Sequence, residues 1–187
     1  LTLIAALAED RVIGSASGGI PWDLPRDRAH FRARTEGRWL LVGRRTYAEM
    51  EGWFGDRTPI ILTKQPDFRP RHPAHRVVAS PAAALDLARA NGVGELIVCG
   101  GAEVYAATLP LAGCLVLTRI GLHVDIPDPV RFPDFESSGE WRLSHTETGQ
   151  PQTGGPPPVA KSMRESRREA WRNHHWPAGR FPASLLG

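Results

Sequence analysis

The sequence has few of the features that mark membrane, secreted or metal-binding proteins. Its two cysteines, Cys99 and Cys114, cannot form a disulfide framework or, alone, a four-ligand metal site. No stretch approaches the roughly 18 consecutive apolar residues that a membrane-spanning helix needs. The first residues have no basic flank and soon reach Glu9 and Asp10, so we expect no secretion signal. These absences favour a protein of a reducing, cytoplasmic compartment that does not bind membranes.

Common catalytic and nucleotide-binding motifs are also absent. Residues 14–19 are rich in glycine and serine but lack the G-x-G-x-x-G order, and no P-loop motif occurs. The seven histidines include no H-E-x-x-H motif or spaced Cys/His set, so we expect no metal. No G-x-S-x-G turn is present. A plain Rossmann protein, a P-loop protein and a metalloenzyme are therefore disfavoured.

The charge is unevenly distributed along the 187 residues, although the formal net charge is only +3. Six of the 23 basic residues and two of the 20 acidic ones lie in residues 151–187, so the first 150 residues carry 17 basic and 18 acidic side chains. The positive excess thus belongs to the tail, where Trp171 and Trp176 lie among the arginines. A non-catalytic module that binds nucleic acid through this tail is one alternative, although no folded recognition motif accompanies it. We expect no specific nucleic-acid partner.

Short apolar runs alternate with helix-like segments over most of the chain. Six buried strands are predicted at residues 1–7, 39–42, 59–63, 76–79, 95–99 and 114–120. Helices are predicted at residues 25–35, 46–52, 81–90 and 102–109. This alternation predicts an α/β fold, a three-layer sandwich whose central, mostly parallel twisted sheet is flanked by helices.

The pattern becomes irregular after Trp141. Residues 149–158 are rich in Gly, Pro and Gln and indicate a linker, and residues 164–172 could form a short polar helix. We therefore divide the chain into a catalytic domain at 1–149 and a divergent Gly/Pro/Arg-rich segment at 150–187, irregular or disordered.

Three junctions after predicted strands carry groups that suit phosphate. The first is the run 43–46, where a glycine, two arginines and a threonine begin a helix; the second contains Lys64, and the third is Gly100-Gly101. Backbone amides at a helix start, the helix dipole and cations all favour an anion. A single strand–Gly–helix turn is common for steric reasons alone. Since three such junctions face one sheet edge, a phosphorylated dinucleotide is the better explanation.

The segment from Ile20 to Phe31 is the most unusual in the chain. Asp27 falls in the first turn of the predicted helix, with Phe31 four residues on over the same face. Asp27 could merely complement the helix N-terminus. Alternatively it is a lone carboxylate in an apolar cleft, able to accept two parallel hydrogen bonds from an amidine-like N–C–N edge. Nearby, Trp53 and Phe54 could line a pocket whose Arg57 receives a substrate carboxylate.

Taken in order, these segments resemble the dihydrofolate reductase family over about residues 1–145. The motifs are L-I-A-A-L at 3–7, D-R-V-I-G at 10–14, I-P-W-x-L-P-x-D-x-x-x-F at 20–31, V-G-R-x-T at 42–46, I-I-L-T at 60–63, G-G-x-x-x-Y at 100–105, L-T at 117–118 and F-P-D-F at 132–135. The resemblance implies an NADPH-dependent oxidoreductase that reduces 7,8-dihydrofolate to 5,6,7,8-tetrahydrofolate, supporting one-carbon metabolism and nucleotide synthesis.

The resemblance also implies roles for individual residues. Asp27 would hold the pterin and promote its protonation, with Trp22 and Thr118 as further catalytic residues. The other substrate-binding residues would be Ile4, Ala5, Phe31, Met50, Phe54 and Arg57. The cofactor would be bound by Ala6, Ile13, Gly14, Gly43, Arg44, Arg45, Thr46, Thr63, Lys64, Gly100, Gly101, Ala102, Glu103, Val104 and Tyr105. Residues 9–22 would form a mobile loop over the nicotinamide, and the Gly100–Gly101 peptide would be cis.

Two departures from the family pattern concern the pocket and the end of the chain. Arg28 stands where the family has an apolar or amide residue, so either its stem packs while its head reaches water or the local shape differs. The Gly/Pro-rich and Arg-rich tail stands where the family closes its sheet with a hairpin. A riboflavin-pathway reductase of the same fold is a second alternative, but the segment with Asp27 argues against it. We expect a monomer.

Overall fold

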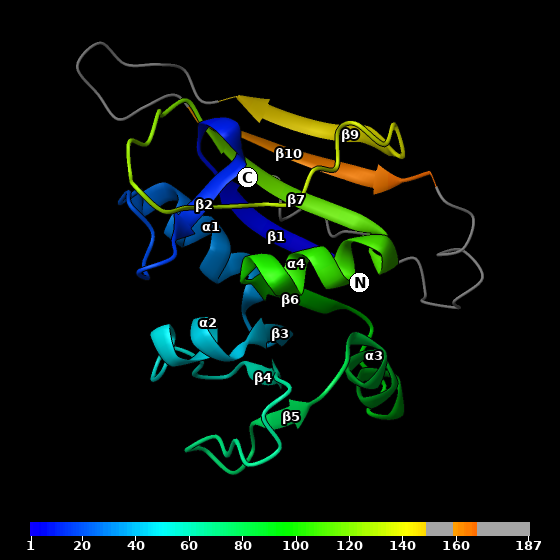
Figure 1. Ribbon diagram of the computed structural model, residues 1–187. Helices are drawn as coiled ribbons and strands as arrows, with labels where there is room; N and C mark the ends of the chain where they lie inside the picture. The colour runs from blue at the N-terminus through cyan, green and yellow to red at the C-terminus, as the bar shows by residue number, and fades with distance from the viewer. Residues whose placement is uncertain (149–158, 168–187) are drawn as a thin grey trace.

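Eight strands form one sheet in the computed structural model, which describes residues 1–148 and 159–167 (Figure 1). In spatial order they are β5 (Arg76–Val78), β4 (Thr58–Leu62), β3 (Trp39–Gly43), β6 (Leu96–Gly100), β1 (Thr2–Leu7), β7 (Cys114–Ile120), β10 (Val159–Ser166) and β9 (Trp141–Thr148). The first six are mutually parallel, whereas β10 runs antiparallel to both β7 and β9. This confirms the predicted mostly parallel sheet.

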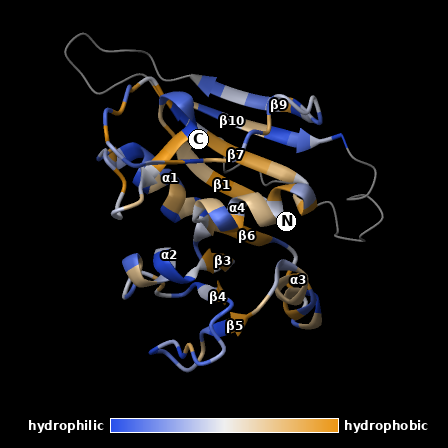
Figure 2. Cartoon of the chain, in the orientation of Figure 1, coloured by the Kyte–Doolittle hydropathy of each residue, from blue (hydrophilic) through white to orange (hydrophobic). Residues whose placement is uncertain are grey.

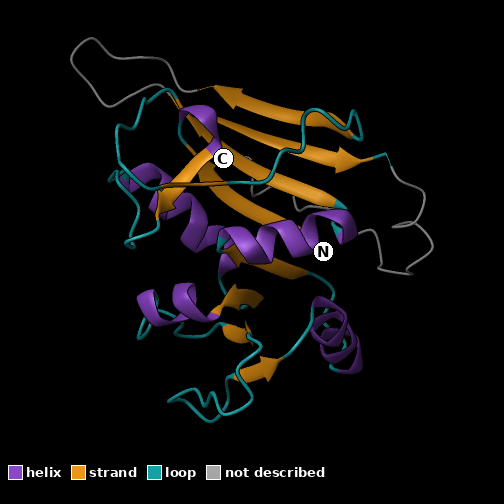
Figure 3. Cartoon of the chain, in the orientation of Figure 1, coloured by secondary structure: helices purple, strands orange, loops and turns teal. Residues whose placement is uncertain are grey.

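Four α-helices cover the two faces of the sheet (Figure 3). Side chains of α1 (Pro25–Thr35) and α2 (Arg44–Glu49) pack on one face, and those of α3 (Pro81–Ala90) and α4 (Ala102–Thr108) pack on the other. Short 3₁₀ turns lie at Glu9–Arg11 and Leu109–Leu111, and a two-stranded sheet joins β2 (Val12–Ser15) to β8 (Pro129–Arg131). None of the described helices is long and apolar enough to cross a membrane.

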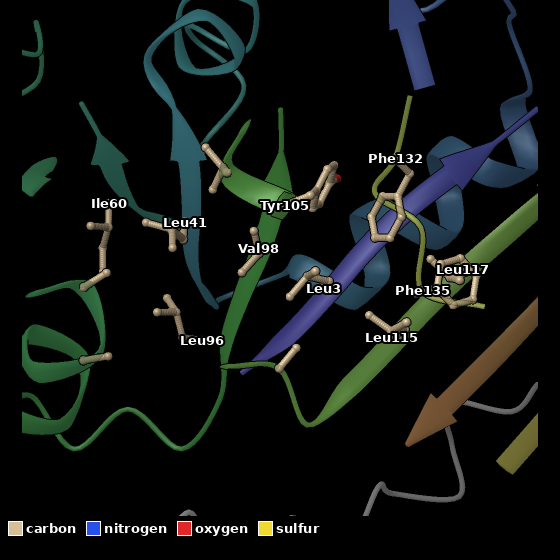
Figure 4. Close-up of a cluster of buried hydrophobic side chains, with 14 of the residues drawn as sticks. Leu3, Leu41, Ile60, Leu96, Val98, Tyr105, Leu115, Leu117, Phe132 and Phe135 are labelled. Atoms are coloured by element: carbon tan, nitrogen blue, oxygen red, sulfur yellow. The ribbon is translucent and has the colours of Figure 1, made fainter. Parts of the chain in front are cut away.

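The central strands are buried on both faces because their side chains alternate between two core clusters. The first cluster contains Leu3, Leu41, Val98 and Leu115 with α3 and α4 residues (Figure 4), whereas the neighbouring Ile4 belongs to the second. The inner strands β1, β6 and β7 are coloured apolar in Figure 2, and the edge strand β9 is mostly hydrophilic. Uninterrupted apolar runs therefore predicted the inner strands.

The antiparallel end of the sheet differs from the expectation. Residues 159–166 were expected to be irregular, and residues 164–172 to be helical; both predictions are wrong for β10, which pairs with β7 from Val159 opposite Ile120 to Glu165 opposite Cys114. Few of its residues are apolar, so no period-two pattern shows, yet the pairing satisfies the backbone groups of β7. β10 thus lies in the same eight-stranded sheet as the strands formed by residues 1–148. The predicted linker at 149–158 and residues 168–187 lie outside the described residues.

Candidate functional site

The junctions that follow β3 and β6 lie against each other at the carboxyl edge of the sheet. A Cβ atom on Gly43 would lie 3.0 Å from Cγ2 of Val104, and one on Gly101 would lie 3.4 Å from Oγ1 of Thr46. The Gly100–Gly101 peptide is cis, as expected, and Gly100 has φ +108°. A side chain on either Gly43 or Gly100 would have to displace its neighbours, so the backbone itself forms this surface.

Free positive groups surround this surface. The residues that precede α2 and α4, Gly43 and Gly101, provide no side-chain cap. Arg44 is half-buried, Arg45 and Lys64 are exposed, and within the described residues none of the three has an ion-pair partner. Open amide groups beside unpaired cations form an environment that suits phosphate.

Asp27 lies in the first turn of α1 and is half-buried. Its carboxylate has no hydrogen bond or ion pair with any of the described residues. The hydroxyl of Tyr105 donates to the carbonyl of Ile4 at 2.6 Å. Burial, as the largest cause, and then the neighbouring Cys99 and Asp27 raise the pKa of Tyr105 well above its usual value. The neighbouring Arg28 head group is exposed and pairs with Asp23 at 2.6 Å, which resolves the first departure noted above.

An apolar surface extends along α1 from Asp27. Ile4, Phe31, Met50 and Phe54, predicted to bind substrate, all belong to or pack against the second core cluster. Phe31 also stacks on Trp53, with ring centroids 5.2 Å apart. Ala5 is the exception, because its side chain packs against the first cluster on the opposite face of the sheet. The structure thus brings four of the five predicted apolar residues together.

Arg57 lies at the other end of α1 and is held by many contacts. Its Nε donates to Oγ1 of Thr35 at 3.0 Å, and its Nη2 donates to the carbonyl of Arg32 at 3.0 Å. Its Nη1 lies 3.1 Å from Oδ1 of Asp56 and 3.5 Å from the carbonyl oxygen of Phe54. The guanidinium carbon sits 4.3 Å from the centroid of a Trp53 ring. These contacts fix a cation beside the last turn of α1.

The predicted loop at 9–22 is joined to a distant segment. The Ser15 hydroxyl donates to Oδ1 of Asp128 at 2.7 Å, and the Ser17 amide donates to Oδ2 at 2.8 Å. These hydrogen bonds, the Ser15 one first, lower the pKa of Asp128. Gly14 is buried in the same segment, where a Cβ would lie 2.9 Å from the carbonyl oxygen of Gly19. No sequence signal singles out Asp128, because 113 residues separate it from Ser15.

Two further polar side chains belong to this part of the molecule: Thr118, which the resemblance already assigned a role, and His30, which the sequence did not single out. Thr118 is buried on β7 with Lys161 of β10 as its register partner. The Nε2 atom of His30 on α1 is buried and has no hydrogen-bond partner among the described residues. Burial, followed by the positive charge of Lys161, lowers the pKa of His30, while Asp27 opposes this effect. The chemistry around Asp27 therefore includes a second titratable group.

Neither the two thiols nor a metal site adds further chemistry within the described residues. Cys99 and Cys114 are free, and burial raises the pKa of both thiols, that of Cys114 to about 12. They are therefore protonated at neutral pH and unsuited to nucleophilic attack. Among the described residues, no group of three His, Cys, Asp or Glu side chains is arranged to hold a metal ion.

Comparison with known proteins gives a consistent result. The family model described as dihydrofolate reductase matches residues 1–158. The type 3 dihydrofolate reductase of Salmonella typhimurium is 34% identical over 146 residues, which cover 78% of this chain and 86% of the relative. The dihydrofolate reductase of Mycobacterium tuberculosis is 37% identical over 153 residues, which cover 77% of this chain and 89% of the relative.

A solved structure is similar over most of the fold. The dihydrofolate reductase of Enterococcus faecalis, complexed with NADP(H) and RAB-propyl, superposes with a TM-score of 0.75 at 27% identity. The match covers 89% of this chain and 96% of the other.

Proposed function

The chain belongs to the dihydrofolate reductase family and, as a member of it, is an oxidoreductase that reduces dihydrofolate with NADPH; we propose which of its residues carry out that reaction. The family assignment favours this reaction over the riboflavin-pathway reduction. The observation that carries the proposal is Asp27, a carboxylate without a partner in the described chain, in the first turn of a helix whose Phe31 packs against the second core cluster.

The glycine junctions at the carboxyl edge would hold the cofactor. Gly43 and Gly101 would allow phosphates to approach the backbone, while Arg44 and Lys64 would neutralise them. The extra cations favour NADPH over NADH. The remaining residues of this set are Ala6, Ile13, Gly14, Arg45, Thr46, Thr63, Gly100, Ala102, Glu103, Val104 and Tyr105. The fit is supported by the absence of side-chain caps on α2 and α4. NADPH, when bound, supplies the hydride.

Asp27 would bind the pterin ring of dihydrofolate. Its two oxygens would accept hydrogen bonds from N3–H and the 2-amino group, and its negative charge would favour a proton on N5. Thr118 would assist through its hydroxyl, and Trp22 would complete the catalytic set. Protonation makes C6 a better hydride acceptor, so the chain would orient the ring and stabilise the proton that N5 takes up from water.

The rest of the substrate would extend along α1. Asp27 and Thr35 are eight residues apart, a separation of about 12 Å at the ordinary helical rise. Phe31, Met50 and Phe54, together with Ile4, would contact the pterin and aminobenzoyl groups between them. Arg57, held by Thr35, would bind the glutamate carboxylate. The length of α1 would thus separate Asp27, which binds the pterin end of the substrate, from Arg57, which binds its acidic end.

NADPH oxidation at 340 nm with dihydrofolate, measured for the wild type and Asp27→Asn, tests this proposal. We expect the variant to lose at least about 100-fold in rate at neutral pH, the usual scale of a proton-transfer contribution. Part of the activity should return in acid, where the substrate arrives protonated. Asp23→Asn is the matched control, because Asp23 is exposed and its ion pair among the described residues is with the exposed Arg28. Equal rates for wild type and Asp27→Asn across pH would remove Asp27 from the mechanism.

The setting and oligomeric state are also proposals. We place the protein in the cytoplasm because its two cysteines are free, as is usual in a reducing compartment. We propose that it acts as a monomer, and light scattering at working concentration tests this directly. A dimeric mass would show the monomer proposal to be wrong.

A further inference from the structure

The Arg57 guanidinium has only one N–H group left for a ligand. A guanidinium has five N–H groups. Nε binds Thr35, one N–H of Nη2 binds the Arg32 carbonyl, and Nη1 faces both Asp56 and the Phe54 carbonyl. A carboxylate bound in the usual two-pronged way needs two parallel N–H groups. An incoming carboxylate therefore has to take a donor from one of the present partners.

Asp56 is the partner that can most easily be displaced. Its side chain is 55% exposed, whereas that of Arg57 is only 11% exposed. Thr35 and the Arg32 carbonyl belong to α1 and cannot move away without distorting the helix. The Phe54 carbonyl accepts at 3.5 Å, the longest of these distances, and belongs to a residue whose side chain lies in the core. The Asp56 carboxylate can instead turn into water at little cost.

We propose that Asp56 is a specificity-determining residue, a resident carboxylate that competes with the substrate carboxylate for Nη1 of Arg57. The inference rests on the proposed role of Arg57 and deepens it. Binding of a tail carboxylate breaks the Asp56–Arg57 pair and brings two negative charges to one guanidinium. The enzyme consequently gains less from the acidic tail of dihydrofolate than an Arg57 without this neighbour would provide. Pterins without a carboxylate do not reach Arg57 and are unaffected.

Kinetics with two substrates test the competition. Dihydrofolate carries the acidic tail, whereas 6-methyl-7,8-dihydropterin has the pterin ring and no carboxylate. We expect Asp56→Asn to raise kcat/KM for dihydrofolate about two- to fivefold, the range of one exposed ion pair. The gain should come through KM with kcat unchanged, because the tail is remote from the reacting atoms. The value for the methylpterin should stay constant.

Two additions make the result specific. Asp86→Asn is the matched control, because Asp86 is an exposed aspartate that pairs with Arg89 on α3 at 3.0 Å. It should change neither substrate's kinetics. Raising the salt concentration should shrink the Asp56→Asn gain, since the competing charge is half-exposed.

The sign of the Asp56→Asn effect decides the proposal. A lower kcat/KM for dihydrofolate would mean that Asp56 orients Arg57 rather than competing at it, and would overturn the inference. An unchanged ratio between the two substrates, or an equal shift in both, would overturn it as well. In those cases the wild type still reduces dihydrofolate and the proposed function stands. A wild type that reduces neither substrate with NADPH would overturn both.

Discussion

The charged side chains at the two ends of the parallel strands differ in whether they are paired. We call these ends the amino edge and the carboxyl edge of the sheet. At the amino edge, Glu95 accepts a hydrogen bond from Thr2 at 2.7 Å and lies 3.5 Å from Nη2 of Arg34. Arg34 is 9% exposed and Glu95 19%, so these charges are largely removed from water and compensate each other. At the carboxyl edge, Asp27 and Arg44 have no hydrogen-bond or ion-pair partner within the described chain.

This difference separates residues that stabilise the fold from residues that await a ligand. A buried polar group without a partner costs free energy, so a chain tends to satisfy such groups internally. Where charged side chains stay open around one surface, a ligand can supply the missing partner. Substitutions at the amino edge should therefore alter the free energy of unfolding, and those at the carboxyl edge should alter binding and rate.

The largest effect is expected from substitutions at the carboxyl edge of the sheet, where the charged side chains have no partner within the described chain. Replacing both Arg44 and Lys64 by alanine should raise the KM for NADPH at least about tenfold, since a hydrogen bond to a charged group contributes about 1.5–3 kcal/mol. The KM for NADH should change much less, because it has one phosphate fewer. Steady-state kinetics with both cofactors measure the ratio. Arg38→Ala, an exposed arginine that precedes β3 at the amino edge, is the control. An equal rise for NADH and NADPH would contradict the cation assignment.

A second substitution tests the amino edge, where Glu95 and Arg34 are paired. Glu95→Ala removes the largely buried carboxylate that contacts both Thr2 and Arg34 and should lower the free energy of unfolding by about 2–4 kcal/mol. Urea denaturation measures the loss, while KM values for both substrates should remain close to those of the wild type. Asp86→Ala, which breaks an exposed pair, should lower the free energy of unfolding by less than about 1 kcal/mol. If Glu95→Ala weakened cofactor binding without destabilising the protein, the contrast between the edges would fail.

Sequence reasoning succeeded where the signal is local. The inner strands are continuous apolar runs, and the motif around Asp27 is contiguous. The start of α3 is indicated by Ser80, whose hydroxyl accepts a hydrogen bond from the Ala83 amide. These features depend on neighbours in the chain. The glycine junctions were also found, because a strand followed by glycine and a helix is visible in the sequence.

The features that sequence reasoning missed depend on contacts between distant segments. β10 is recognisable only beside β7, because its own residues do not alternate. The Ser15–Asp128 hydrogen bond and the contacts of Arg57 with Thr35 and Arg32 come from segments that meet only in the folded chain. Ala5 is a different case, because the local alternation of its strand turns its side chain to the opposite face from Ile4.

The smallest expected effect is the contribution of His30 to the pH dependence of the free energy of unfolding. Burial lowers the pKa of His30 below its ordinary value of 6.5, so the unfolded chain binds a proton there before the folded one does. Stability should therefore fall as the pH decreases from about 6.5 toward the lower pKa of the folded state. His75, whose pKa is also lowered by burial, should act in the same direction.

Replacing His30 isolates its share of that slope. His30→Gln should make the urea midpoint less dependent on pH between 7.5 and 5.5, with little change at the upper end. His145→Gln, which removes an exposed imidazole from β9, controls for the loss of a histidine. If the His30→Gln midpoint followed the wild-type curve throughout, the imidazole would have to titrate alike in both states. The negative charge of Asp27 would then offset both the burial of His30 and the positive charge of Lys161.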